Sequence, residues 1–173
     1  MRSIAHIARR EWVSLLCSPT GLVLVTLYLA LSGYLFSLNV SVTQQATLRY
    51  TFASLGTLTI FVVPLVTMRL LAEELRTNTF EVLIAHPVGD AQIVLGKFLA
   101  GLVVLSVMLS PTLLYLPILE FLGSPDWGQS LCCYLGQLLL GAMLVGLGLL
   151  ISGLTQSQVL AGMAAMVGGV LLM

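Results

Sequence analysis

Charge is the property that this sequence most clearly lacks. Only seven Lys and Arg and seven Asp and Glu occur among the 173 residues, so 8% of the chain is charged. A soluble domain normally carries about a quarter charged residues. Because 58% of the residues are hydrophobic and the mean hydropathy is +1.06, the composition excludes an ordinary soluble domain and indicates a membrane protein.

Residues that bind metals or nucleotides are also scarce. The three cysteines, Cys17, Cys132 and Cys133, have no CxxC spacing, and we interpret them as small apolar membrane residues. His6 and His86 are far from any carboxylate within a membrane span, so we expect no metal site and no proton relay. The chain also has no GxxxxGK[ST] phosphate loop, which predicts that it binds no nucleotide itself.

What the chain does have is a series of long uncharged intervals, each of which can be compared with the roughly 20 apolar residues that cross a bilayer. No charge follows Asp126, and a single helix from there to the end would be about 70 Å long, so a turn is expected at "SGLTQSQ". The polar stretch "NVSVTQQAT" is predicted to be a loop. The sequence therefore predicts an all-α, polytopic transmembrane bundle with spans at residues 21–38, 52–68, 98–119, 129–151 and 159–173.

The positions of the fourteen charges bear on the class of function. All of them fall at or outside the ends of the predicted spans. An intramembrane enzyme needs a nucleophile with a base, or paired carboxylates, and an ion-coupled carrier usually has an ionisable group within a span. The sequence therefore argues against both classes and predicts a non-catalytic protein whose spans are moved from outside the membrane.

The basic residues also predict an orientation. The positive-inside rule places the side that is richer in Lys and Arg in the cytoplasm. Of the seven Lys and Arg residues, only Arg49 lies on one side of the predicted membrane. We therefore expect a multi-pass protein of the plasma (inner) membrane whose N-terminus and segment 69–97 are cytoplasmic. The basic residues of the opposite side are Arg2, Arg9, Arg10, Arg69, Arg76 and Lys97.

Residues 3–17 form a separate amphipathic feature with one apolar and one polar helical face. We predict a helix that lies on the membrane surface, with Arg9 and Arg10 reaching lipid phosphates and Trp12 at the interfacial level. The alternative is that these residues begin a long first helix.

The segment 69–97 holds seven of the fourteen charges. Each charge would cost roughly 2.5–3.5 kcal/mol at the bilayer centre, so we expect the segment outside the membrane. Asn78 and Glu81 have the spacing of a capping box, and Pro87 ends the same helix, which predicts a short helix on the cytoplasmic face. Such a helix would suit contact with a cytoplasmic partner. The alternative from the residues alone is a solvated loop.

Small residues recur four positions apart in the last two predicted spans, a spacing typical of close helix packing. We predict packing within the bundle rather than a dedicated dimer seam. The residues are Ala142 and Gly146, Gly148 and Ser152, and Ala161, Ala165 and Gly169.

Residues 63–101, "VPLVTMRLLAEELRTNTFEVLIAHPVGDAQIVLGKFLAG", resemble the signature of ABC-2 type permeases, and among them the gliding-motility-type subfamily. The signature covers the second span, a coupling helix and the third span. Leu75, Asn78 and Phe80 depart from the usual pattern, and a weaker resemblance extends through residues 7–23 and 123–142. The matching residues are Pro64, Thr67, Met68, Arg69, Glu73, Glu74, Arg76, Thr79, Glu81, Pro87, Gly96 and Lys97.

The resemblance implies the transmembrane permease subunit of an ATP-driven exporter, in which the coupling helix sits in a groove of a separate ATPase subunit. ATP and Mg²⁺ would be bound by that subunit, with no cofactor on this chain. The expected partners are the ATPase, a second permease copy or a related permease, and the lipid bilayer, with no nucleic acid. The implied coupling residues are Glu73, Glu74, Arg76, Asn78, Thr79, Phe80, Glu81, Leu83, Ile84 and Pro87.

Permeases of this family usually have six spans, whereas this sequence ends at Met173 inside its fifth apolar run. We therefore expect the last span to be missing. The alternative function is that of a small polytopic membrane protein with a structural or assembly role and no ATPase partner.

Overall fold

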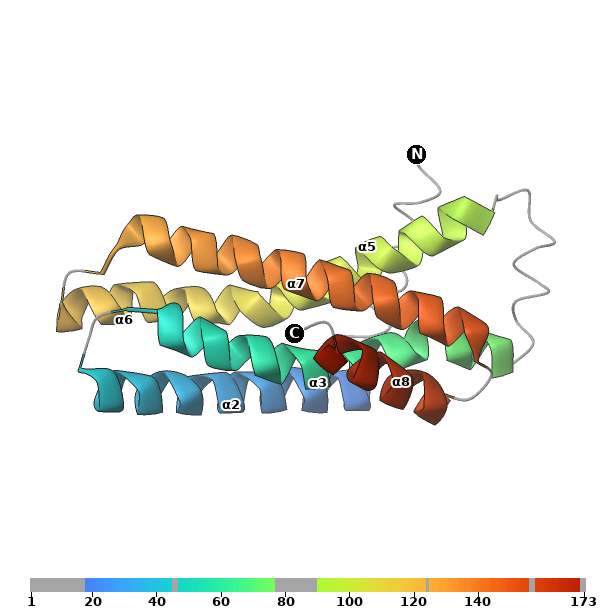
Figure 1. Ribbon diagram of the computed structural model, residues 1–173, viewed down its shortest axis with the longest axis horizontal. Helices are drawn as coiled ribbons and strands as arrows, with labels where there is room; N and C mark the ends of the chain where they lie inside the picture. The colour runs from blue at the N-terminus through green and yellow to red at the C-terminus, as the bar shows by residue number, and fades with distance from the viewer. Residues whose placement is uncertain (1–17, 45–46, 77–89, 124, 156–157, 172–173) are drawn as a thin grey trace.

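The computed structural model describes residues 18–44, 47–76, 90–123, 125–155 and 158–171, and every element within these ranges is helical (Figure 1). The elements are α2 (Pro19–Thr43), α3 (Arg49–Arg76), α5 (Asp90–Leu109), the 3-10 helix η1 (Ser110–Leu114), α6 (Tyr115–Leu122), α7 (Trp127–Leu154) and α8 (Gln158–Leu171). Four described segments are long and apolar enough to cross a membrane, and a shorter apolar helix follows them. The predicted polytopic helical bundle is confirmed. The four segments are Gly21–Thr43, Arg49–Thr67, Val94–Leu122 and Trp127–Leu154.

The helices lie along one long axis, and their connections gather at its two ends (Figure 1). The α2–α3 and α6–α7 connections share one end, where the Thr47 hydroxyl donates a hydrogen bond of 3.1 Å to the Gln129 side chain. We call this the Arg49 end. The last turn of α3, the first turn of α5 and the α7–α8 turn lie at the opposite end, which we call the Arg76 end. It follows that α3 and α7 run parallel to each other and antiparallel to α2 and to the α5–α6 crossing.

The first crossing is longer than predicted, because α2 continues through the first residues of the expected loop "NVSVTQQAT" to Thr43. Three polar side chains there donate to backbone oxygens one turn back: Asn39 to Leu35 at 2.8 Å, Ser41 to Ser37 at 2.8 Å and Thr43 to Asn39 at 2.7 Å. Polar side chains that bond to their own helix in this way need no solvent. The helix then ends at Gln44, whose left-handed backbone has a φ of 53°.

α3 is the central helix of the bundle. It packs against α2, α5, α7 and α8, and 56% of its crossing segment is buried, compared with 17% for α2. The second span was predicted at residues 52–68, and the helix around it runs from Arg49 through Pro64 to Arg76. α3 therefore continues without a break from the apolar part of the bundle into the segment that was predicted to be cytoplasmic.

The third crossing is a broken helix, since α5, η1 and α6 follow one another without a loop. Its first helix begins at Asp90, eight residues before the predicted span at 98–119. Lys97 was expected beyond the end of that span, yet it lies within α5 and its side chain is only 1% exposed. α5 thus turns the Lys97 side chain toward the interior of the bundle, and its position relative to the membrane stays a prediction.

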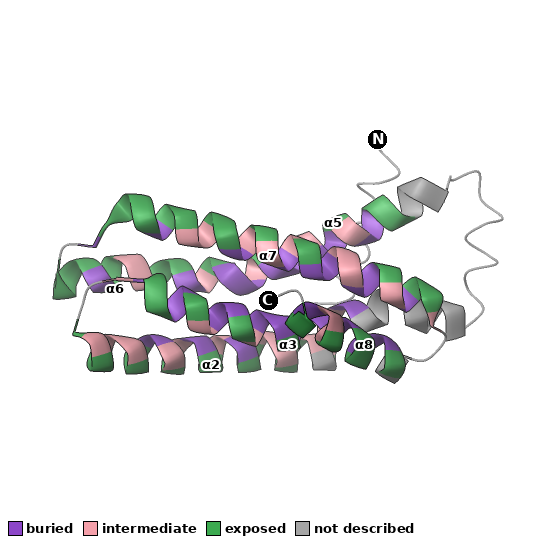
Figure 2. Cartoon of the chain, viewed as in Figure 1, coloured by how far each residue is buried: buried purple, intermediate pink, exposed green. Residues whose placement is uncertain are grey.

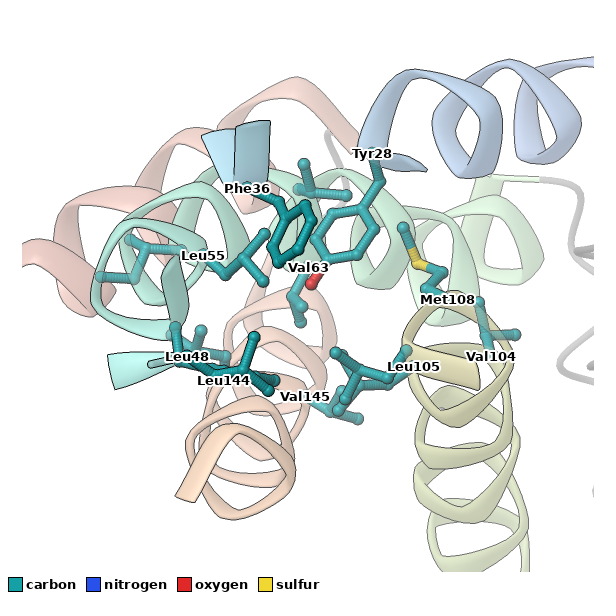
Figure 3. Packing of buried hydrophobic residues seen from close by; sticks show 14 of the residues in the cluster. Tyr28, Phe36, Leu48, Leu55, Val63, Val104, Leu105, Met108, Leu144 and Val145 are labelled. Atoms are coloured by element: carbon teal, nitrogen blue, oxygen red, sulfur yellow. The ribbon is translucent and has the colours of Figure 1, made fainter. Parts of the chain in front are cut away.

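Most side chains of the core come from α2, α3, α5 and α7, and Figure 3 shows them converging on a common interior. Buried residues line the inner faces of the helices, and exposed residues line the outer faces (Figure 2). Most of the large exposed side chains are apolar, as is expected of surfaces that face lipid. The labelled core residues are Tyr28, Phe36, Leu48, Leu55, Val63, Val104, Leu105, Met108, Leu144 and Val145.

Small residues of α7 and α8 let neighbouring helices approach closely. A Cβ on Gly148 would lie 2.1 Å from the Thr67 hydroxyl oxygen, and a Cβ on Gly141 would lie 2.1 Å from a Leu105 methyl group. A Cβ on Gly169 would lie 2.9 Å from a Leu144 methyl group. All three contacts are within the chain, so the prediction that small residues pack the bundle is confirmed at Gly148 and Gly169.

Candidate functional site

The structure describes only a few of the residues that were predicted to couple the chain to an ATPase. Glu73, Glu74 and Arg76 belong to the last turns of α3, where the helical backbone is described but the side chains are not. Asn78, Thr79, Phe80, Glu81, Leu83, Ile84 and Pro87 lie outside the described residues, as do Arg9, Arg10 and Trp12 of the predicted interfacial helix. In the sequence, residues 77–89 lie between the end of α3 at Arg76 and the start of α5 at Asp90.

The described site is a polar core inside the bundle, and its centre joins α3 to α7. The Gln137 side-chain amide of α7, which is 4% exposed, donates to the Leu55 backbone oxygen of α3 at 3.3 Å and to the Thr59 hydroxyl. Thr59 in turn donates to the same Leu55 oxygen at 2.8 Å. One backbone oxygen thus accepts from both helices, and the two helices are held in a fixed register.

Tyr28 brings α2 to the same centre. Its side chain is 1% exposed, and its hydroxyl oxygen points into the interior of the bundle (Figure 3) near Thr59 and Gln137. Among the described residues no group meets normal hydrogen-bond geometry with this hydroxyl, although Thr59 and Gln137 lie close enough to interact with it. The hydroxyl of buried Thr51 also has no partner among the described residues. A buried hydroxyl without a partner costs about 1–3 kcal/mol.

A second part of the polar core lies closer to the Arg49 end, around the break in the third crossing. The Tyr134 hydroxyl of α7 donates to the Thr112 backbone oxygen of η1 at 2.7 Å. The hydroxyls of Ser32 in α2 and Tyr115 in α6 are 2.9 Å apart. The Tyr115 ring also stacks on Phe36, with ring centroids 4.3 Å apart. These contacts attach the broken crossing to α2 on one side and to α7 on the other.

Toward the Arg76 end, the buried polar residues are Thr67 of α3, Ser152 of α7 and Lys97 of α5. Thr51, Thr59 and Thr67 are all buried and occur at intervals of eight residues along α3. Polar side chains therefore occur along most of the length of the bundle interior.

Sequence reasoning missed this polar core, because it treated the spans as almost wholly apolar. The available signal was the cost of a polar side chain in lipid, which favours positions that face other helices. The chemistry that the core offers is hydrogen bonding by hydroxyl and amide groups. Among the described residues, no three His, Cys, Asp or Glu side chains are close enough to hold a metal ion together.

Comparison with known proteins agrees with this architecture. No curated protein matches the chain. The family described as ABC-2 family transporter protein matches residues 35–173, which are 139 of the 173 residues. The match begins within α2 and includes α3, the segment that joins α3 to α5, and every later helix. This multi-pass membrane protein therefore belongs to the ABC-2 family of transporter proteins.

Proposed function

We propose that the chain is the permease subunit of an ATP-driven ABC exporter of the gliding-motility type. It would pair with a second copy or a related permease in the plasma membrane, with its N-terminus in the cytoplasm. A separate ATPase subunit would bind ATP and Mg²⁺. The observation that carries this proposal is the family match across residues 35–173.

The connection between α3 and α5 supports a coupling role for segment 77–89. A force on this segment acts directly on two crossing helices, because α3 ends at Arg76 and α5 begins at Asp90. α3 has 28 residues with Pro64 among them, so it is about 42 Å long and reaches from the Arg76 end to the Arg49 end as one continuous helix.

The contacts of α3 show which helices would follow such a displacement. Gly148 of α7 packs against Thr67 near the Arg76 end, and Gln137 of α7 bonds to the Leu55 backbone oxygen farther along. With two attachments at different depths, α7 cannot pivot freely about either one. We therefore expect α3 and α7 to move as a pair during the transport cycle.

The proposed coupling can be tested with Glu81→Lys, which reverses a charge in the predicted docking helix. We expect the ATPase subunit to be lost on purification, and transport-coupled ATP hydrolysis to be lost with it. Glu120→Lys is the matched control, because Glu120 is an exposed carboxylate of α6 at the opposite end of the bundle. The control should retain the ATPase.

Two outcomes would contradict the proposal in different ways. If Glu81→Lys retains the ATPase and its coupled hydrolysis, the predicted docking helix is wrong. If no ATPase co-purifies even with the unmodified chain from its native membrane, the alternative of a structural or assembly role is favoured.

A further inference from the structure

The break in the third crossing has a clear chemical origin. Pro111 and Pro117 have no backbone N–H, so the oxygens of Val107 and Leu113, four residues earlier, lose their usual α-helical donors. Between α5 and α6 the chain forms the 3-10 helix η1 (Ser110–Leu114). A 3-10 segment within an α-helix has weaker hydrogen bonds and often marks a hinge.

One side chain of the same segment replaces a lost donor, and a second adds a bond within the same turn. The Ser110 hydroxyl donates to the Val107 oxygen at 2.9 Å, and the Thr112 hydroxyl donates to the Leu109 oxygen at 2.7 Å. Because every backbone group must be satisfied in lipid, these bonds allow a broken helix to persist inside the membrane. They are all local, so they do not fix the direction in which α6 leaves η1.

That direction is fixed instead by contacts from two other helices. Tyr134 of α7 donates to the Thr112 backbone oxygen at 2.7 Å, on the hinge itself. Beyond the hinge, Tyr115 at the start of α6 bonds to Ser32 and stacks on Phe36, both of α2. Most of α6 past this point is exposed, and Leu119 is its only buried residue.

From these contacts we propose that η1 is a hinge on which α6 swings, and that Tyr134 and the Ser32–Tyr115 pair form a latch that holds α6 against the bundle. α6 has eight residues and is about 12 Å long, so a swing of about 20°, the size of a typical helix kink, moves its far end by about 4 Å. If the chain is the permease of an exporter, this motion opens the Arg49 end when α3 and α7 are displaced. The link to export rests on the proposed function, whereas the hinge and its latch do not.

The hinge can be tested by measuring a distance between spin labels in the full chain in lipid nanodiscs. Labels at Phe121→Cys in α6 and Val42→Cys in α2 occupy positions that are 91% and 73% exposed, and the native cysteines are replaced by serine. A reference pair joins Val42→Cys to Leu131→Cys of α7, which bypasses α6. Pulsed electron resonance then gives the distribution of each distance.

Tyr134→Phe removes the latch hydroxyl and keeps the ring. We expect it to broaden or shift the distance from α2 to α6 by about 4 Å, the displacement of a 20° kink, without changing the reference pair. Tyr34→Phe is the control, because Tyr34 is an exposed tyrosine of α2. Replacing both Pro111 and Pro117 with alanine restores the missing backbone donors. We expect this double variant to narrow the distribution of the distance from α2 to α6, even in the Tyr134→Phe background.

The outcomes separate the hinge from the proposed function. If neither Tyr134→Phe nor the double proline variant changes the distance from α2 to α6, the hinge and its latch are refuted. If Tyr134→Phe and the double proline variant both change the distance as expected when the ATPase is absent, the hinge stands. In that case, a distance that stays unchanged when a non-hydrolysable ATP analogue is added to the complex with the ATPase would refute the link to export and leave the hinge in place.

Discussion

Gly148→Ala tests whether α3 and α7 are as closely packed as the structure shows. The added Cβ would lie 2.1 Å from the Thr67 hydroxyl oxygen, 2.7 Å from the Thr67 Cβ and 3.3 Å from its methyl group. Rotating the Thr67 side chain moves the oxygen and the methyl group but not the Cβ, which is attached to the backbone. The two helices must therefore separate, and overpacking of this kind costs about 1–3 kcal/mol.

The control variants lie on the same helix. A Cβ on Gly136 or Gly153 of α7 would meet no atom within 4 Å. Alanine is favoured over glycine within a helix by about 0.5–1 kcal/mol, so Gly136→Ala and Gly153→Ala should leave stability unchanged or slightly raise it. Because all three substitutions add one methyl group to α7, the difference between them isolates the contact with Thr67.

The assay is thermal unfolding of the purified chain in detergent, followed by helical circular dichroism. For a chain of this size, 1 kcal/mol corresponds to about 2–4 °C, so Gly148→Ala should unfold about 2–12 °C below Gly136→Ala. Thr67→Ala removes the hydroxyl and methyl groups and should recover part of that loss. The reasoning is refuted if Gly148→Ala and Gly136→Ala unfold at the same temperature.

Three further predictions use the same assay. Gln137→Leu removes two hydrogen bonds and should cost about 1–2 kcal/mol, and a double-mutant cycle with Thr59→Val should show a coupling of at least about 0.5 kcal/mol. Zero coupling would contradict the contact. Gly141→Ala collides mainly with the end of the Leu105 side chain, so it should destabilise the unmodified chain but not a Leu105→Ala background, and equal losses in both would be evidence against the collision. Asp126 caps α7 by accepting from the N–H groups of Gly128 and Gln129, so Asp126→Ala should cost about 0.5–2 kcal/mol and Asp126→Asn much less.

The crossings themselves could be predicted from the sequence, because the cost of inserting a charge leaves few places where a span can end. The turn expected at "SGLTQSQ" agrees with the end of α7 at Leu154 and the start of α8 at Gln158. The end of the first crossing was missed. Polarity alone predicts a loop at "NVSVT", and only the hydrogen bonds of Asn39, Ser41 and Thr43 to their own helix explain why α2 continues.

The polar core was beyond sequence reasoning for a different reason. Tyr28, Thr59 and Gln137 lie in three different spans, and no pattern along the chain connects the three. They meet only because α3 and α7 run parallel with α2 beside α3, and that arrangement depends on tertiary packing. The burial of Lys97 was not predicted for the same reason, because its place in the sequence does not reveal which way α5 faces.

The bond between Gln137 and Leu55 has a consequence for how the chain is made. Its two residues are 82 positions apart, so at a synthesis rate of about 5–20 residues per second Leu55 is added about 4–16 s before Gln137. Thr59 already donates to Leu55 within its own helix, so α3 can wait in lipid with this hydroxyl satisfied. The Gln137 amide can bond to Leu55 and Thr59 only after α7 has been inserted beside α3. The order of synthesis thus places Thr59 of α3 in the membrane before Gln137 of α7 arrives to bond with it.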